Sequence, residues 1–122
     1  MILLDTNALI WTDQGDKRVS RLLKERRHLY ISPASLLELQ FLSEAGRIRL
    51  HERDVNALAN DERWMLDDPP SAAWFATAAH IGWTRDPFDR LLAAHAQFRD
   101  WKLATGDRAL LDQLGARYSL EL

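Results

Sequence analysis

Short apolar runs alternate with helical stretches along most of this chain, and this alternation restricts the possible folds more than any other feature. The apolar runs predict strands at residues 1–4, 28–31, 64–66 and 101–105. Apolar spacing and capping residues predict helices at residues 18–27, 33–45, 54–63, 71–80, 87–98 and 108–114. Strands that alternate with helices form a parallel sheet with helices on both faces. We therefore expect an α/β fold.

Length and composition indicate one folded domain that spans residues 1–122. The chain has no cysteine, which excludes a disulfide scaffold and a zinc–thiolate site and fits a reducing compartment. It shows no signal-peptide pattern and no apolar stretch near the roughly 20 residues of a membrane span, so we expect a cytoplasmic protein with no membrane partner. The net charge of −2 argues against bulk coating of nucleic acid but allows a local basic patch.

Acidic residues stand where a parallel sheet builds its sites, beyond the carboxyl ends of the strands. Asp5 directly follows the first predicted strand, and Asp107 comes two residues after the last. Glu38 lies on the small and apolar face of the helix at 33–45, where an ionised carboxylate needs a partner. Asp86 and Asp89 share one helical turn. Taken singly, each has an ordinary alternative: a place at a helix N-terminus for the aspartates, and an arginine ion pair for Glu38.

Together these acids indicate a metal site. Two carboxylates about 5 Å apart repel each other by roughly 3 kcal/mol at an effective dielectric constant near 20, so a cluster of four is hard to keep ionised without a cation. Oxygen ligands in a chain without cysteine favour a hard divalent ion, Mg²⁺ or Mn²⁺, over zinc. Ions held by carboxylates commonly serve phosphate chemistry.

Four segments resemble the four signatures of PIN-domain ribonucleases, and their order and spacing are most similar to VapC-type toxins of bacterial toxin–antitoxin pairs. The segments are DTNALIW at 5–11, SPASLLE at 32–38, RDPFDRLLAA at 85–94 and LATGD at 103–107. The resemblance implies a three-layer PIN-like fold, with a parallel sheet between helices, and RNA hydrolysis that depends on Mg²⁺ or Mn²⁺. It also implies a homodimer and a cognate antitoxin protein that blocks the site.

The resemblance also assigns site residues. The metal ligands and catalytic residues that it implies form an acidic quartet: Asp5, Glu38, Asp89 and Asp107. The supporting positions that it implies are Asn7, Asp86 and Thr105. Two positions depart from the family pattern, because His95 stands where similar sequences often have Gln, and Gly106 stands where a larger residue is common. Neither departure removes a metal ligand.

We therefore expect a Mg²⁺-dependent endoribonuclease in which a metal-activated water attacks the phosphodiester bond. The alternative is a catalytically degenerate PIN module that only binds protein or RNA, and loss of a quartet member would favour it. Two other classes fit less well. A phosphatase of the haloacid dehalogenase type needs a second Asp where Asn7 stands, and a receiver domain needs adjacent acids near the end of the first strand.

Three further features concern the surroundings of this site. The densest basic stretch predicts either a rim that binds the RNA backbone or a solvated helix face. It comprises Lys17, Arg18, Arg21, Lys24, Arg26 and Arg27. Trp11 follows the Asp-Thr-Asn segment by four residues and is expected to border the entrance to the site. The four histidines are expected to be structural.

Overall fold

The computed structural model describes residues 1–24, 28–50 and 54–122. Within them, five strands form one parallel sheet in the order β3-β2-β1-β4-β5. The strands are β1 (Ile2–Leu4), β2 (Leu29–Ile31), β3 (Met65–Leu66), β4 (Lys102–Thr105) and β5 (Ser119–Glu121). In the central strand β1, Leu3 pairs with Tyr30 of β2 on one side and with Leu103 of β4 on the other. The predicted α/β fold with a parallel sheet is confirmed.

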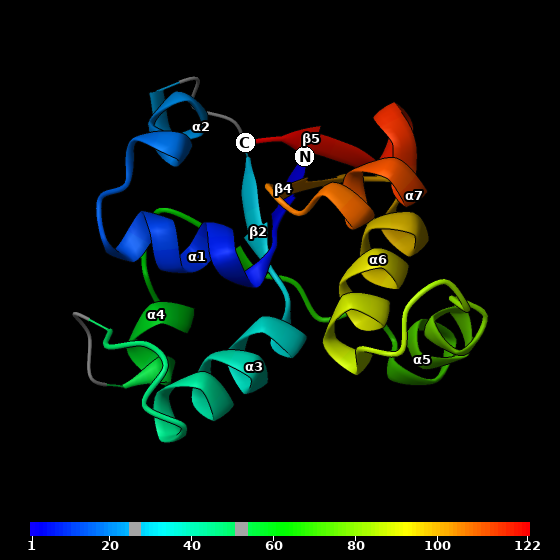
Figure 1. Ribbon diagram of the computed structural model, residues 1–122, viewed down its shortest axis with the longest axis horizontal. Helices are drawn as coiled ribbons and strands as arrows, with labels where there is room; N and C mark the ends of the chain where they lie inside the picture. Colours follow the sequence, from blue (N-terminus) through cyan, green and yellow to red (C-terminus); the bar gives the residue numbers. More distant parts are fainter. Residues whose placement is uncertain (25–27, 51–53) are drawn as a thin grey trace.

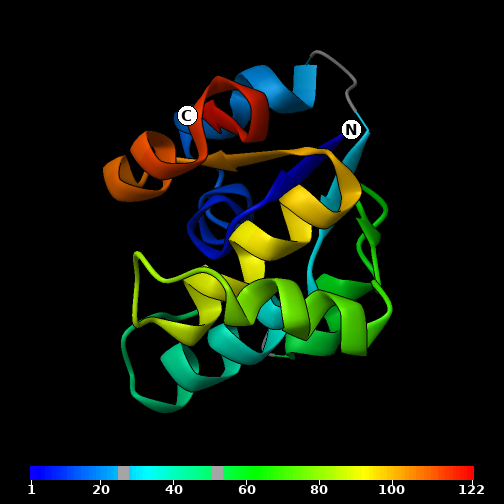
Figure 2. The same cartoon turned by 90° about the vertical axis from the view of Figure 1, so that its right-hand side faces the viewer.

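Helices cover both faces of this sheet (Figure 1). They are α1 (Thr6–Asp13), the short 3-10 helix η1 (Lys17–Val19), α2 (Ser20–Lys24), α3 (Pro33–Glu44), α4 (Val55–Ala59), α5 (Ser71–Ala79), α6 (Pro87–Arg99) and α7 (Arg108–Tyr118). In Figure 1, α1, α2 and α4 lie to one side of the strands, and α5, α6 and α7 lie to the other. Figure 2 shows α5, in green, packed beside α6, in yellow. No helix in the described part of the chain combines the length and apolar character needed to cross a membrane.

The core has two parts because successive side chains of a strand point to opposite faces of the sheet. Ile2 and Leu4 of β1 pack with Leu9 of α1, whereas Leu3 packs with Leu92 of α6. All five side chains are buried. Burial of one such side chain contributes roughly 1.5–3 kcal/mol, so the two layers of helices hold β1, and the residues that follow it, firmly in place.

Some element boundaries differ from the predictions. The helix predicted at 54–63 is limited to α4, because the Asp61 carboxylate accepts hydrogen bonds from both the backbone and the side chain of Arg63 and closes a turn there. The helix predicted at 18–27 is divided into η1 and α2, and residues 25–27 lie outside the described residues. The strand β5 was not predicted. It follows Gly115, whose positive φ of 68° interrupts α7 before a last turn leads into the strand.

Candidate active site

A pocket of about 50 Å³ opens at the carboxyl ends of β1 and β4, where α1 and α7 begin. Residues of α3 and α6 complete its wall, so four segments that are far apart in the sequence meet here. The lining residues are Asp5, Thr6, Asn7, Glu38, Leu42, Asp89, Leu92, Asp107 and Leu110. Among the described residues, no lysine, arginine or histidine lines it. We call it the acidic pocket, and its volume is sufficient for a cation with bound water.

Asp5 and Asp107 each follow a strand and cap the helix that begins there. Asp5 Oδ1 accepts a hydrogen bond of 2.7 Å from the Ala8 N–H, and Asp107 Oδ1 accepts one of 3.0 Å from the Leu110 N–H. Thr105, which is fully buried, connects the two acids: it hydrogen-bonds the Asp5 carboxylate, and its Oγ1 accepts from the Asp107 N–H at 3.0 Å. Both aspartates therefore cap helices and line the pocket.

Glu38 reaches the pocket from the middle of α3 and is half-buried. The Thr6 hydroxyl, which lies 3.2 Å from the Ser35 hydroxyl, also hydrogen-bonds Glu38. Within the described residues, no arginine or lysine forms an ion pair with Glu38, so the alternative of an arginine partner finds no support there. The hydroxyl network offers hydrogen bonds but does not neutralise the charge.

Asp86 and Asp89 differ in role although they share the first turn of α6. Asp86 Oδ1 accepts hydrogen bonds from the backbone N–H groups of Phe88 at 2.8 Å and of Asp89 at 3.1 Å, which makes Asp86 the N-cap. Asp86 is exposed and is not among the residues that line the acidic pocket, whereas Asp89 is. The structure thus brings Asp89 to the quartet and leaves Asp86 beside it.

The acidic pocket holds negative charge that no described lysine, arginine or histidine in its lining compensates. Burial raises the pKa of Asp5 to about 6, against a hydrogen bond with Thr105 that lowers it. Burial raises the pKa of Asp89 to about 7, and repulsion from Asp86 and from the other three pocket acids adds to the rise. Burial and the Asp86 charge also raise the pKa of Glu38. A cation in the pocket would relieve all of these effects at once.

The donor set fits a hard divalent cation. Carboxylate oxygens surround the pocket together with the Asn7 side chain, and Mg²⁺ and Mn²⁺ favour such ligands. In the described part of the chain, no three Asp, Glu or His side chains already stand close enough together to hold an ion. The carboxylates that line the pocket would therefore have to move closer together to ligate one ion jointly.

Sequence reasoning missed Thr6 and Ser35 as parts of the site. Thr6 belongs to the first motif, and Ser35 lies one turn before Glu38 on the same face of α3, so both positions carried a usable signal. Trp11 does not line the pocket. Its ring lies against Gly106, the residue before Asp107, so closely that a Cβ at Gly106 would stand 2.7 Å from Trp11 Cη2.

The described histidines and the described part of the basic stretch do not line the acidic pocket. His95 is fully buried, and its Nε2 lies 2.6 Å from Asp67 Oδ2. In the basic stretch, Arg18 forms a two-point ion pair with Asp16, and its guanidinium covers the Trp11 ring at 3.9 Å from the ring centre. Arg26, Arg27 and His51 lie outside the described residues. The role of the basic stretch stays a prediction.

The PIN domain family matches residues 2–115 of this chain. The chain therefore belongs to the PIN domain family, and the resemblance drawn from its four motifs is confirmed. Ribonuclease VapC22 of Mycobacterium tuberculosis is 31% identical over 116 residues, which cover 89% of this chain and 88% of that protein.

Two solved structures show the same fold. A toxin–antitoxin complex from Klebsiella pneumoniae contains a chain with a TM-score of 0.71 and 17% identity, and the match covers 98% of this chain and 96% of that one. VapBC2 from Rickettsia felis, bound to a DNA fragment from its promoter, gives a TM-score of 0.68 at 17% identity, with 99% and 98% covered. At these identities the likeness establishes the fold alone.

Proposed function

We propose that this protein is a Mg²⁺-dependent endoribonuclease, with Mn²⁺ as a substitute ion. The observation that carries the proposal is the acidic pocket. Four carboxylates from four segments line it, no described cationic side chain does, and the pKa values of three of them are raised. The relative named Ribonuclease VapC22, 31% identical along most of the chain, supports RNA as the substrate class.

The residues of the pocket have distinct tasks in this reaction. Asp5, Glu38, Asp89 and Asp107 would hold a divalent ion, which when bound would lower the pKa of a water and offset charge on the scissile phosphate. Thr105 holds Asp5 and Asp107 in position relative to each other, because it hydrogen-bonds the Asp5 carboxylate and accepts a hydrogen bond from the Asp107 backbone N–H. Asn7 is exposed at the pocket and offers an uncharged amide to the phosphate. Asp89 would supply a carboxylate from the first turn of α6, and a bound cation would offset the burial and repulsion that raise its pKa to about 7.

We also propose that the protein acts in the cytoplasm as the toxin of a toxin–antitoxin pair, as a homodimer bound by an antitoxin. Solved structures of similar fold come from such complexes, which supports a protein partner. Exposed apolar side chains offer surfaces that a second copy or an antitoxin could cover. Leu37 and Phe41 are each 52% exposed on α3, and Met65 is 66% exposed on the edge strand β3.

RNA cleavage tests the proposal. Purified protein should cut total cellular RNA in Mg²⁺ and leave it intact in EDTA. Glu38→Gln should abolish cleavage, because it removes a charge from the acidic pocket. Glu44→Gln is the matched control on the same helix: Glu44 is exposed, and its Oε1 accepts only the Gln40 amide at 3.1 Å in the described structure. Wild-type protein that neither cleaves RNA nor binds Mg²⁺ or Mn²⁺ by calorimetry would contradict the proposal and favour a degenerate binding module.

A further inference from the structure

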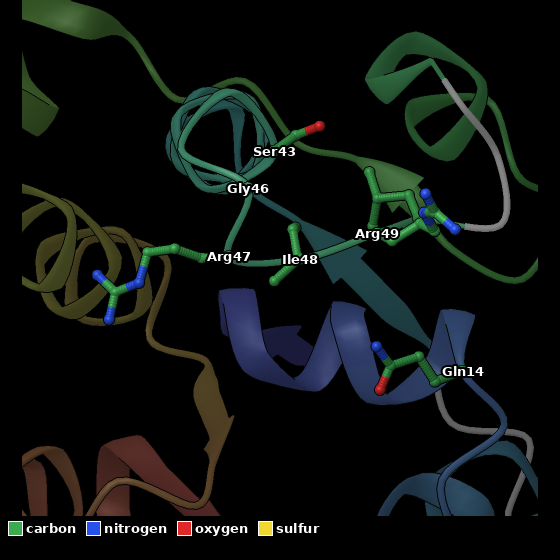
Figure 3. Close-up of a pocket in the computed structure, with 7 residues that line it drawn as sticks. Gln14, Ser43, Gly46, Arg47, Ile48 and Arg49 are labelled. Atoms are coloured by element: carbon green, nitrogen blue, oxygen red, sulfur yellow. The ribbon is translucent and has the colours of Figure 1, made fainter.

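A second and larger pocket, of about 950 Å³, lies at the C-terminal ends of α1 and α3 (Figure 3). Its lining residues are Gln14, Ser43, Gly46, Arg47, Ile48, Arg49 and Leu50, and we call it the basic pocket. Gly46 has a φ of +70°, a conformation that favours glycine, and it turns the chain away from α3. The Arg47 N–H then donates to the Leu42 carbonyl at 2.9 Å, which fixes the start of the loop.

The two arginines of this loop are available for a ligand. Both are exposed, and neither forms a hydrogen bond or an ion pair with any residue that the structure describes. Figure 3 shows their side chains extending to opposite sides of the loop, with Ile48 between them and Gln14 of α1 facing the loop. Glu44, the nearest acid before them in the chain, accepts a hydrogen bond from Gln40. Guanidinium groups without a carboxylate partner bind phosphate well, because their planar N–H donors match its oxygens.

Residues of α3 line both the basic pocket and the acidic pocket. Leu42 lines the acidic pocket, and Ser43, the next residue, lines the basic one. From Glu38 to the end of α3 at Glu44 the helix rises about 9 Å, at 1.5 Å per residue. A strand with one phosphate in the acidic pocket therefore reaches the arginines within a few nucleotides.

We propose that the basic pocket binds the phosphate backbone of the RNA strand whose scissile bond lies in the acidic pocket. This inference rests on the proposed function and specifies the surface that holds the RNA substrate. The acidic pocket repels phosphate until a cation is bound, so attraction for the strand must come from cations beside it. Arg47 and Arg49 supply that attraction, and Gln14 and Ser43 add uncharged polar groups. No described aromatic side chain lines the basic pocket, so the contact is made to the backbone rather than by stacking on bases.

RNA binding in EDTA tests this inference without any cleavage. The probe is a short fluorescein-labelled oligouridine, followed by fluorescence anisotropy at several salt concentrations. Arg47→Ala/Arg49→Ala should weaken binding about tenfold and reduce the salt slope by about 1.4, because two phosphate contacts contribute about 0.7 each for a single strand. Arg47→Lys/Arg49→Lys keeps both charges and should keep the slope. Arg117→Ala is the matched control: this exposed arginine lies at the end of α7 and pairs with Asp100 at 3.3 Å.

Two results would overturn the inference: binding by the double alanine variant equal to that by Arg117→Ala, or an unchanged salt slope. Either result, with wild-type cleavage intact, would leave the proposed function standing. It would favour an acidic protein segment, rather than RNA, as the ligand of the basic pocket. The opposite combination, an altered slope with no cleavage by the wild type, would support the backbone site while contradicting the nuclease.

Discussion

Asp5, Asp107 and Asp86 all cap helices, yet only the first two also line the acidic pocket. A carboxylate has two oxygens with several lone pairs, so capping through Oδ1 leaves acceptor capacity for a metal ion. The N-terminus of a helix also favours the charged form of the acid that caps it. At the scale of single residues, the same local geometry therefore serves both the fold and the site, and which caps lie at the pocket depends on the sheet order.

Substitutions of Asp86 and Asp89 should have different effects on stability and on cleavage. Asp86→Ala removes the acceptor of two backbone hydrogen bonds and should lower the free energy of unfolding by about 1 kcal/mol. Asp89→Asn removes a repelled charge, so it should keep the fold in EDTA while it abolishes cleavage in Mg²⁺. Urea denaturation and RNA cleavage rates measure both effects. Near-normal cleavage by Asp89→Asn would remove it from the site.

Gly106→Ala should disturb the site through Trp11. The added Cβ would stand 2.7 Å from the ring, which is also held by the Arg18 guanidinium on its face, so either the ring or the backbone next to Asp107 must shift. We expect a loss of about 1–3 kcal/mol in stability and weaker Mn²⁺ binding by calorimetry. Gly82→Ala is the control, because its Cβ would meet nothing within 4 Å.

A double variant with the smaller ring of Phe at position 11 extends this experiment. Gly106→Ala combined with Trp11→Phe should recover part of the Mn²⁺ affinity lost in Gly106→Ala alone. Equal Mn²⁺ affinity of Gly106→Ala and Gly82→Ala would show that this close contact does not position Asp107.

At the scale of elements, a partly buried polar cluster joins α6 to the segment after β3. Asp67 accepts hydrogen bonds from Arg99 Nε at 2.9 Å and from the fully buried His95 at 2.6 Å. Burial lowers the pKa of His95, against its bond to Asp67, and hydrogen bonds from Arg99 and His95 hold the pKa of Asp67 below its usual range despite burial. A neutral His95 facing an ionised Asp67 must carry its proton on Nε2, which leaves Nδ1 as the acceptor without a described partner.

Asp67→Ala should destabilise the protein by about 1–3 kcal/mol, because it leaves the His95 Nε2–H buried and unpaired. Asp112→Ala, which breaks an exposed 4.0 Å pair with Arg108, should change stability by less than about 0.5 kcal/mol. Thermal and urea unfolding of both variants compare the two. Equal stabilities would show that the cluster contributes nothing to holding α6.

The elements that sequence could predict are those with strong local signals. Pro33 after Ser32 and Pro87 after Asp86 mark the starts of α3 and α6, and both helices begin there. The early end of α4 was not predicted because the local hydrogen bonds between Arg63 and Asp61 close a turn there, and β5 was not predicted because its pairing with β4 decides it. β5 has three residues, and its pairing with β4, such as Leu120 beside Ala104, leaves no signature in the chain itself. The end of the helix predicted at 108–114 coincides with the break in α7 at Gly115, but the turn after this break was not predicted.

The candidate site was predictable where motif residues follow strands. Asp5, Asp107 and Glu38 meet because β1, β2 and β4 are neighbours whose carboxyl ends share one edge. The basic pocket was not predictable, because the turn at Gly46 places the loop that carries Arg47 and Arg49 beside the C-terminal end of α1. A spacing of two residues in a loop does not by itself indicate a common pocket.

At the scale of the whole molecule, the acidic pocket makes metal-free stability depend on pH. Asp5 and Asp89 keep protons up to pH about 6 and about 7 when folded, whereas in the unfolded chain they lose them near pH 4. Between these values the folded state binds more protons, so these groups make the free energy of unfolding fall as pH rises.

In EDTA, we therefore expect the stability of Asp89→Asn relative to the wild type to rise between pH 4.5 and 7.5, by on the order of 1–2 kcal/mol in the free energy of unfolding after solvent screening, with a matching rise in relative melting temperature. Saturating Mg²⁺ should reverse the difference at pH 7.5, because the ion stabilises the state that binds it. A constant difference across this pH range would show that Asp89 does not carry the unfavourable charge.

Calorimetric titration with Mn²⁺ at pH 7.5, followed by cleavage of the same samples, tests the central claim most directly. The account predicts that the wild type binds Mn²⁺ and cleaves RNA, that Asp89→Asn loses both, and that Asp112→Asn, with the same charge change on an exposed face of α7, retains both. Mn²⁺ binding by Asp89→Asn as tight as that by the wild type, or cleavage that persists without a bound ion, would contradict the assignment of the acidic pocket as the metal centre.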